Sequence, residues 1–327
     1  MSEKLRWGII GTGFIAELFV TDLLANGFSV AAVGSRTEGA AQEFAERFDI
    51  PAAHASYEDL VADESVDIVY VATPHPFHFA NTTLALNAGK HVLVEKAFTI
   101  NAKDAAAIVA LAEEKNLVVL EAMWTRFLPH MARLRELIAE GVVGQVRTVI
   151  ADHNQSLPSD PTHRLQDPAL GGGALLDLGI YPVSFAWDIL GKPTSVTAIA
   201  SKTPTGVDRQ TAIILGYEDG QQALLHTALD TAGPNTASVI GTDGWVAIER
   251  VFYEPTAFTV YNTAGDVIER YESQVSDRGM QYQAAEVENL VRAGALAGDI
   301  LPPSETVGIM ETLDEIRAQI GLVYPGE

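Results

Sequence analysis

Three polar side chains of this sequence lie in apolar stretches, where a charged or hydroxyl-bearing group is expected either to form a hydrogen bond or ion pair or to take part in a functional site. Lys96 follows the apolar run 91–95, and Asp177 and Tyr181 lie in the glycine-rich stretch 171–181. The lysine is either a surface residue or a cation aimed into a site. The other two residues would share one face of a helix, so the tyrosine is either a core hydroxyl held by the carboxylate or an acid/base group that faces a substrate.

The elements that would position these groups begin with a strand–helix–strand unit over residues 5–34. An apolar strand leads into the pattern G-x-G-x-x-A at 11–16, and a helix and a second strand follow. The first glycine permits the tight turn, the second lets a pyrophosphate approach the backbone, and the helix N-terminus offers N–H groups to the phosphates. Because both flanks fit, we favour a dinucleotide site over an ordinary glycine turn. Its expected contacts are Gly11, Thr12, Gly13, Phe14 and Ile15.

The residues after the second strand indicate which dinucleotide binds. NAD sites usually carry an acidic residue there, about 20 residues past the glycines, for the ribose 2′-OH. This chain has Ser35, Arg36 and Thr37 instead. The hydroxyls could bind a 2′-phosphate, and the guanidinium could pair with it or stack on the adenine. We therefore expect NADP, with NAD possible; the alternative is that Arg36 is a solvated surface charge.

Apolar runs and helix-period segments alternate through residues 1–122. Further strands are expected at 66–72, 91–96 and 117–121, and helices at 38–48, 57–62, 77–87 and 101–115. This alternation predicts an α/β fold, a Rossmann doubly wound parallel sheet over residues 1–122. Because ligands bind outside the carboxyl ends of such strands, Lys96 would lie beside the nicotinamide.

The pattern changes in residues 123–327. Strands are expected at 145–154, 195–201, 211–217, 221–229, 237–241, 245–252 and 258–261, and helices at about 129–140, 173–190 and from 302 onwards. Asp-Gly and Gly-Asp pairs between strands are typical of hairpins. We expect a C-terminal α+β domain with a mostly antiparallel sheet, which binds substrate and supports oligomerisation.

The composition excludes several classes of function. Lys and Arg number 21 and Asp and Glu 43, so the net charge is −22, which argues against nucleic acid and anionic membrane partners. The chain has no cysteine and therefore no disulfide or thiol chemistry. No apolar run reaches the ~18 residues that a membrane helix needs, and no signal peptide precedes the first strand. We expect a soluble cytoplasmic protein.

The histidines at 75 and 78 could be taken for a metal pair. A zinc site needs three or four ligands, and no cysteine or glutamate stands at a matching spacing, so we expect no metal. His78 at a helix start is expected to be a substrate-pocket or packing residue.

These motifs together resemble the glucose–fructose oxidoreductase / inositol dehydrogenase / MocA family over nearly the whole chain. The resemblance rests on Gly11-x-Gly13, Ala72-Thr73-Pro74, Glu95-Lys96 and the motif from Gly171 to Tyr181. The stretch 121–127, with tyrosine rather than histidine at 181, is most similar to the branch of trans-1,2-dihydrobenzene-1,2-diol dehydrogenases and NADP-dependent D-xylose 1-dehydrogenases.

The family resemblance implies hydride transfer to nicotinamide, roles for the lysine and tyrosine described above, and a C-terminal sheet that often forms dimers. The implied cofactor contacts are Thr73, Pro74, His75, Glu95 and Lys96. The implied substrate contacts are His78, Trp124, Arg126, Asp177 and Tyr181. The chain departs from the family at Ala97, where a proline usually follows the lysine, often in a cis bond, and at His75, where an asparagine is usual.

We therefore expect an NADP-dependent dehydrogenase of a sugar, such as an aldopyranose, or of a cyclic trans-dihydrodiol. Tyr181 would take the proton of the substrate hydroxyl; a free tyrosine has a pKa of ~10, and the Lys96 ammonium would favour the phenolate. Asp177 would orient this pair or bind a substrate hydroxyl, with Trp124 as an apolar wall supported by Arg126. The alternative is a non-catalytic NADP-binding regulator. We also expect a homodimer or higher homo-oligomer through the C-terminal sheet.

Overall fold

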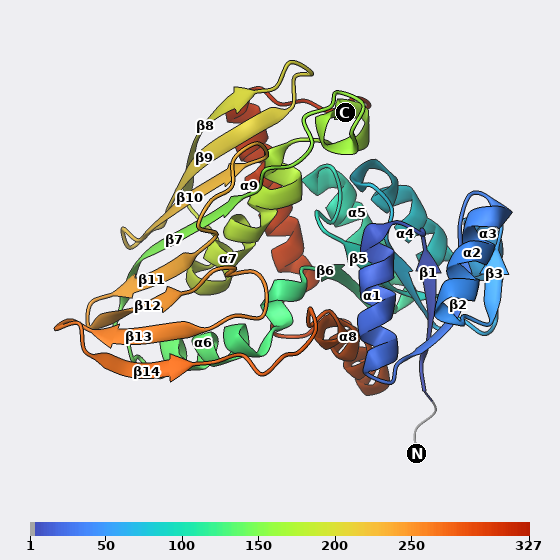
Figure 1. The fold of residues 1–327 in the computed structure, drawn as a ribbon, viewed down its shortest axis with the longest axis horizontal. Helices are drawn as coiled ribbons and strands as arrows, with labels where there is room; N and C mark the ends of the chain where they lie inside the picture. The colour runs from blue at the N-terminus through green and yellow to red at the C-terminus, as the bar shows by residue number, and fades with distance from the viewer. Residues whose placement is uncertain (1–3) are drawn as a thin grey trace. The chain divides into compact units, whose positions relative to one another are not determined.

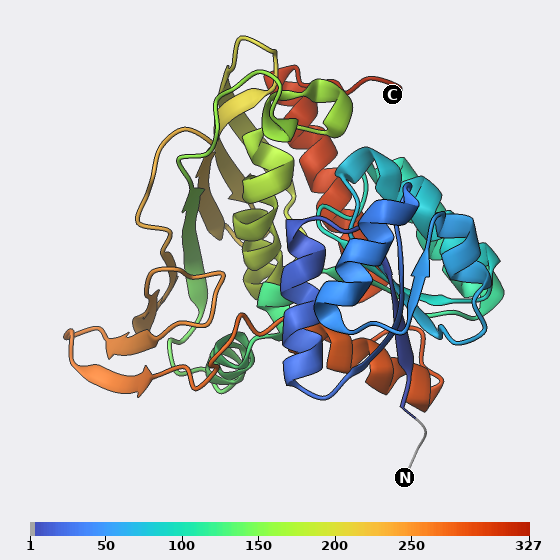
Figure 2. The ribbon, with the colours of Figure 1, turned by 45° about the vertical axis from the view of Figure 1, so that its right-hand side comes forward.

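The computed structural model describes residues 4–327, whose helices and strands are labelled in Figure 1 and seen from a second direction in Figure 2. The chain divides into two compact units. Unit 1 comprises Met1–Trp124 and Asp277–Val307, and unit 2 comprises Thr125–Ser276 and Gly308–Glu327.

In the described part of unit 1, the core is a six-stranded sheet of order β3-β2-β1-β4-β5-β6. All its pairings are parallel. The strands are β1 Arg6–Ile10, β2 Ser29–Gly34, β3 Ala52–His54, β4 Ile68–Val71, β5 His91–Glu95 and β6 Val119–Ala122. The strand order reverses between β1 and β4, and β4 is buried along its whole length, as a central parallel strand should be. The expected Rossmann doubly wound sheet is confirmed.

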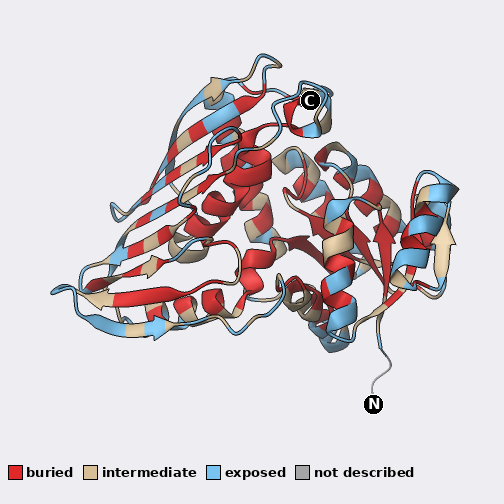
Figure 3. Cartoon of the chain, in the orientation of Figure 1, coloured by how far each residue is buried: buried red, intermediate tan, exposed pale blue. Residues whose placement is uncertain are grey.

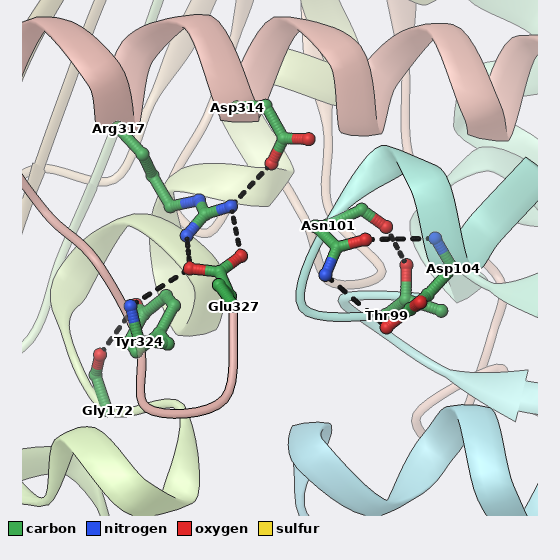
Figure 4. Close-up of polar contacts among 8 residues, drawn as sticks. All are labelled: Thr99, Asn101, Asp104, Gly172, Asp314, Arg317, Tyr324 and Glu327. Atoms are coloured by element: carbon green, nitrogen blue, oxygen red, sulfur yellow. Dashed lines mark hydrogen bonds and ion pairs between the residues drawn. The ribbon is translucent and has the colours of Figure 1, made fainter.

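Helices and short turns connect the strands of unit 1. They are α1 Phe14–Ala25, α2 Glu38–Phe48, α3 Tyr57–Ala62, the 3-10 turn η1 His75–Phe77, α4 His78–Asn87 and α5 Ala102–Lys115. Local capping explains where two of them begin. The Ser56 hydroxyl accepts from the Asp59 N–H at the start of α3, and the Asn101 side chain accepts from the Asp104 N–H at the start of α5 (Figure 4).

The segment Asp277–Val307 joins unit 1 and not the second domain, which differs from the expected division into residues 1–122 and 123–327. It contains α8 Gln281–Ala293, a helix that the sequence analysis did not predict. Asp22 on α1, only 3% exposed, accepts a hydrogen bond from the Met280 N–H (2.8 Å), and Trp7 Nε1 donates to Glu288 (3.1 Å). These contacts, distant in sequence, hold α8 in unit 1.

In the described part of unit 2, the core is an eight-stranded sheet of order β14-β13-β12-β11-β7-β10-β9-β8. The β7–β10 pair is parallel and the other pairs are antiparallel. The strands are β7 Val146–Asn154, β8 Ser195–Lys202, β9 Asp208–Gly216, β10 Gln222–Ala228, β11 Ala237–Gly241, β12 Gly244–Ile248, β13 Phe258–Asn262 and β14 Val267–Tyr271. The expected mostly antiparallel α+β domain is confirmed; β14 was not predicted.

The helices of unit 2 are α6 Pro129–Ala139, α7 Ile180–Leu190 and most of α9 Pro303–Ile320. In Figures 1 and 2 they lie on one face of the eight-stranded sheet. The strands β7 to β10 leave large apolar side chains exposed, which gives those strands their mixed colouring in Figure 3. They are Ile150 (41%), Ile199 (73%), Ile214 (48%) and Leu224 (39%).

The stretch Pro168–Leu190 is long and apolar enough, by length and composition, to cross a membrane. The sequence analysis expected no such stretch. In the structure 89% of its most apolar window is buried, which is also the behaviour of a core helix. The stretch is not one regular helix, because residues Leu175–Gly179 form a π-helix before α7 begins, where a single helix over 173–190 was expected.

Candidate active site

The loop between β1 and α1 has the shape that a pyrophosphate requires. Gly11 has a φ of +104°, and a Cβ there would lie 2.9 Å from the Ala72 carbonyl oxygen, so a side chain has no room. Gly13 begins α1 without a side-chain cap, and a Cβ built on it meets no described atom within 4 Å. The open backbone and the uncapped N–H groups fit a dinucleotide phosphate. Around them, Phe14 is 74% exposed, and Thr12 and Ile15 are partly exposed.

A pocket of about 420 Å³ lies beside the ends of β2 and β4, within unit 1. Arg36 lines it, and its guanidinium carbon lies 6.0 Å from the centre of the Phe77 ring. The pocket also contains Tyr57, whose pKa is raised by burial and lowered in part by the charge of Arg36. Thr73 and Pro74 line it as well, whereas Ser35 is buried. Thr37, like Arg36, is exposed. Tyr57 and Phe77 were missed by the sequence analysis.

Glu95 is the last residue of β5 and Lys96 follows it, at the carboxyl edge of the parallel sheet. Glu95 is 5% exposed and accepts hydrogen bonds from the Tyr70 hydroxyl and from the Lys96 N–H (3.3 Å). Lys96 itself is partly exposed. The peptide bond between Lys96 and Ala97 is cis, the isomer that the family's proline often has. The Glu95 carboxylate therefore binds the backbone of Lys96 and the Tyr70 side chain, and its expected cofactor contact stays a prediction.

Two histidines bind the backbone around Lys96. His75 Nε2 lies 3.1 Å from the Lys96 carbonyl oxygen. His78 is fully buried, with Nδ1 2.9 Å from the Ala97 carbonyl oxygen and Nε2 2.6 Å from that of Thr73. Burial lowers the pKa of His78. Both ring nitrogens face backbone carbonyls and link the ends of β4 and β5, which favours the packing role among the two roles expected for His78.

Trp124 follows β6 and is 2% exposed. The guanidinium carbon of Arg278 lies 5.3 Å from the centre of its ring, a cation–π contact within unit 1. The sequence analysis missed Arg278, because nothing in its local sequence predicts a contact with a residue so far back in the chain.

Arg126 belongs to unit 2 and its side chain is 3% exposed. It donates to the Ser184 carbonyl oxygen (2.9 Å) and pairs with Asp188 (3.3 Å). Both partners lie on α7. This buried cation anchors the helix that carries Tyr181, and the expected substrate contact stays a prediction.

Asp177 and Tyr181 lie in the interior of unit 2. Asp177, 7% exposed, accepts from both terminal nitrogens of Arg164 (3.1 and 3.2 Å). Tyr181, 8% exposed, packs its ring against His153 (4.9 Å between centres, edge to face) and Tyr253 (5.1 Å). Arg164, His153 and Tyr253 were not predicted as site residues. Because Asp177 lies in the π-helix Leu175–Gly179 and Tyr181 in α7, the two residues do not share one face of a single regular α-helix, as was expected.

The structure thus gathers the predicted residues into two sets, one in each unit. The cofactor contacts, Lys96 and Trp124 belong to unit 1, whereas Asp177 and Tyr181 belong to unit 2. Across residues 4–327, no group of three or more His, Cys, Asp or Glu side chains is arranged to hold a metal ion.

Comparison with known proteins identifies the family. Residues 5–123 match the model of the oxidoreductase family GFO/IDH/MocA, NAD-binding Rossmann fold, and residues 131–247 match the GFO/IDH/MocA C-terminal domain. The chain therefore belongs to the GFO/IDH/MocA oxidoreductase family and is an NAD(P)-dependent dehydrogenase.

Two groups of curated relatives match almost the full length. The chain is 36% identical to a D-xylose 1-dehydrogenase (NADP(+)) of Hypocrea jecorina, covering 98% of this chain and 93% of the relative. It is also 36% identical to the trans-1,2-dihydrobenzene-1,2-diol dehydrogenase of Mus musculus, covering 98% of both.

Two solved structures show the same fold at lower identity. One is a 3-ketoreductase from Actinomadura kijaniata in complex with NADP and TDP-benzene, with a TM-score of 0.86 and 26% identity over 97% of this chain and 98% of that one. The other is an aldose-aldose oxidoreductase from Caulobacter crescentus complexed with glycerol, with a TM-score of 0.87 and 27% identity over 97% of both chains.

Proposed function

We propose that this dehydrogenase transfers hydride between NADP and a secondary alcohol of a cyclic substrate, either a sugar such as an aldopyranose or a trans-dihydrodiol. The observation that carries the proposal is the layout of unit 1. The open glycine loop, the Arg36 pocket and Lys96 all follow strands of one parallel sheet, at its carboxyl edge. The two curated relatives act on these two substrate classes, by their names.

Arg36 supports the choice of NADP over NAD. Its guanidinium lines the pocket at the end of β2, where NAD-binding members of this fold place an acidic residue. A 2′-phosphate there would be met by a cation and by the nearby hydroxyls of Ser56 and Tyr57. Because the overall net charge of −22 repels an anionic cofactor, binding depends on a local cation such as Arg36.

We assign the proton transfer to Tyr181, with Lys96 as its cationic partner. When bound, the nicotinamide supplies the acceptor for hydride. The Lys96 ammonium favours the phenolate form of Tyr181, and this phenolate takes the proton of the substrate hydroxyl as its carbon loses hydride. The same ammonium stabilises the negative charge that develops on the substrate oxygen. The rings of His153 and Tyr253 limit how the Tyr181 ring can turn.

The remaining site residues position these groups. The Arg164 guanidinium balances the charge of Asp177, so this carboxylate can accept a hydrogen bond from a substrate hydroxyl without standing as an isolated charge. Trp124 gives the substrate ring an apolar surface, held by Arg278. Arg126 acts through α7, and His75 and His78 act through the backbone at Lys96.

We further propose a cytoplasmic homodimer or higher homo-oligomer. Support comes from an apolar groove of about 410 Å³ across β7, β8, β9 and β10 in unit 2. It includes the exposed side chains of Ile199, Ile214 and Leu224. Exposed apolar surface of this kind favours association with a second copy.

The experiment that tests the proposed function is an absorbance scan at 340 nm. The purified protein is mixed with NADP and, in turn, with pentoses, hexoses and cyclic trans-diols. Reduction of NADP with at least one member of the panel is the expected result. If the cofactor binds but no substrate of either class is oxidised, and no corresponding ketone or lactone is reduced with NADPH, the proposal is wrong. That result would favour the alternative, a non-catalytic NADP-binding regulator.

A further inference from the structure

The glycine-rich segment before the π-helix is held very closely by its surroundings in unit 2. The Gly172 N–H donates to the Asp167 carbonyl oxygen and the Gly173 N–H to that of Leu165, both at 3.0 Å. A Cβ on Gly172 would lie 2.6 Å from the Leu165 carbonyl oxygen. Gly173 has a φ of +119°, and a Cβ there would lie 2.2 Å from Asp208 Oδ1. The segment is therefore closely packed against groups that the proposed reaction does not use.

Asp208, at the start of β9, is the first of these groups. Its side chain is fully buried. Oδ2 accepts hydrogen bonds from the Leu175 N–H (2.8 Å) and from the Thr211 hydroxyl (2.9 Å). Leu175 is the first residue of the π-helix that contains Asp177. The carboxylate thus fixes the point at which the helix begins.

The second group comes from the segment 321–327. The hydroxyl of Tyr324, a residue only 2% exposed, donates to the Gly172 carbonyl oxygen at 2.8 Å (Figure 4). Glu327 fixes the tyrosine in turn, since its carboxylate accepts from the Tyr324 N–H (2.9 Å). The same carboxylate accepts hydrogen bonds from both terminal nitrogens of Arg317 (2.7 and 2.8 Å). Arg317 also donates to Asp314 (2.6 Å).

The Arg317 guanidinium completes this arrangement by its place on the aromatic ring. Its central carbon lies 5.2 Å from the centre of the Tyr324 ring. The arginine side chain is 7% exposed and Glu327 20%, so the ion pair is largely shielded from water. Figure 4 shows the chain of contacts running from α9 through Glu327 and Tyr324 to Gly172.

We propose that Tyr324 and Asp208 are positioning residues for the proposed reaction, with Glu327 and Arg317 holding Tyr324 in place. Their hydrogen bonds to Gly172 and Leu175 hold residues 172–175 in place, and we call these contacts the clamp. The clamp determines the positions of Asp177 in the π-helix and Tyr181 in the first turn of α7. The inference rests on the proposed function, because it concerns the same acid/base residue. A shift of ~1 Å at a reacting group can cost about a hundredfold in rate, so the clamp acts on turnover more than on cofactor binding.

The test is Tyr324→Phe, which removes the hydroxyl and keeps the ring. We expect kcat to fall roughly tenfold, which corresponds to about 1.4 kcal/mol. The dissociation constant for NADP, measured by fluorescence quenching, should stay within about twofold, because the predicted cofactor contacts belong to unit 1. The pH profile of kcat should shift, and hydrogen–deuterium exchange of the peptide 171–181 should become faster.

The matched control is Tyr217→Phe. Tyr217 is a tyrosine of unit 2 whose buried hydroxyl has no hydrogen-bond partner among residues 4–327. Its removal should leave kcat, the pH profile and the exchange of 171–181 unchanged. Glu327→Gln should act in the same direction as Tyr324→Phe but less, and the double variant should be no worse than Tyr324→Phe alone, since both act through one contact.

The outcomes separate the clamp from the proposed function. If Tyr181→Phe is inactive while Tyr324→Phe keeps the wild-type kcat, pH profile and exchange rates, the clamp is refuted and the function stands. If Tyr181→Phe turns over normally, the acid/base role proposed for Tyr181 fails and the clamp fails with it, whereas the dehydrogenase activity stands. If Tyr324→Phe does not fold, as judged by circular dichroism, Glu327→Gln decides by the same three readouts.

Discussion

Replacing Asp208 with asparagine perturbs a buried charge at the start of the helix that carries the proposed acid/base residue. Burial raises the pKa of this carboxyl from 3.8 to about 6, although the Thr211 hydroxyl and the Leu175 N–H oppose the rise. The charge of Asp208 acts on the nearby Tyr324 hydroxyl, which is itself influenced by Arg317, Glu327 and Asp177. An amide oxygen in the place of Oδ2 can accept the same two hydrogen bonds without a charge.

The sign of the effect follows from the protons bound in each state. Between pH 3.8 and about 6 the folded chain keeps the Asp208 proton that the unfolded chain has lost. The contribution of Asp208 to the free energy of unfolding of the wild type therefore falls as the pH rises through this window. Asp208→Asn has no such proton. Because one pKa unit is worth about 1.36 kcal/mol, the variant should gain up to roughly 3 kcal/mol relative to the wild type between pH 4 and pH 7.

Urea unfolding of both proteins at several pH values measures this difference directly. Groups distant from Asp208 titrate equally in the two proteins, and the pKa of the coupled Tyr324 is raised well above its ordinary value, outside this window, so the difference isolates Asp208. Asp230→Asn is the control, because Asp230 has a 41% exposed side chain and a distant partner, Arg209 at 3.8 Å. A stability difference that stays constant with pH, or one that favours the wild type more at pH 7 than at pH 4, would refute the reasoning.

Two further predictions concern the cofactor and the assembly. Arg36→Ala should raise the KM for NADP roughly 10- to 100-fold, the loss expected for one charge-assisted hydrogen bond, and should change the KM for NAD little. Steady-state kinetics with both cofactors measures the two KM values. Equal increases in both would argue against a 2′-phosphate contact. Ile199→Lys, which puts a charge on a 73% exposed apolar position of the groove, should yield monomers in light scattering. The control Val267→Lys, outside the groove, should leave the oligomer intact. If the Ile199→Lys protein is as oligomeric as the control, the groove is not the interface.

The fold of unit 1 could be predicted from local pattern, and its last helix could not. Apolar runs marked β4 and β5 to within a few residues, and Asn101 marked the start of α5 as expected. The segment Asp277–Val307 carries no comparable signal. Its place depends on contacts such as Asp22 with the Met280 N–H, which join residues far apart in sequence.

The sequence indicates candidate site residues by their types but does not indicate which side chains they contact in the fold. His78 and Arg126 look functional in sequence because they are polar residues beside motifs, yet each is buried against backbone or α7. Whether a polar side chain faces a cleft or the interior depends on which distant groups meet it. The same reason explains why Arg164 and His153, which contact Asp177 and Tyr181, were missed.

The most direct test of the central claim is pre-steady-state reduction of NADP by Tyr181→Phe, followed at 340 nm with a substrate that the wild type oxidises. General acid–base catalysis contributes about 10²- to 10⁴-fold, so the rate of hydride transfer should fall within that range while NADP still binds with wild-type affinity. A hydride-transfer rate within about twofold of the wild type would remove the phenol from the reaction and contradict the account.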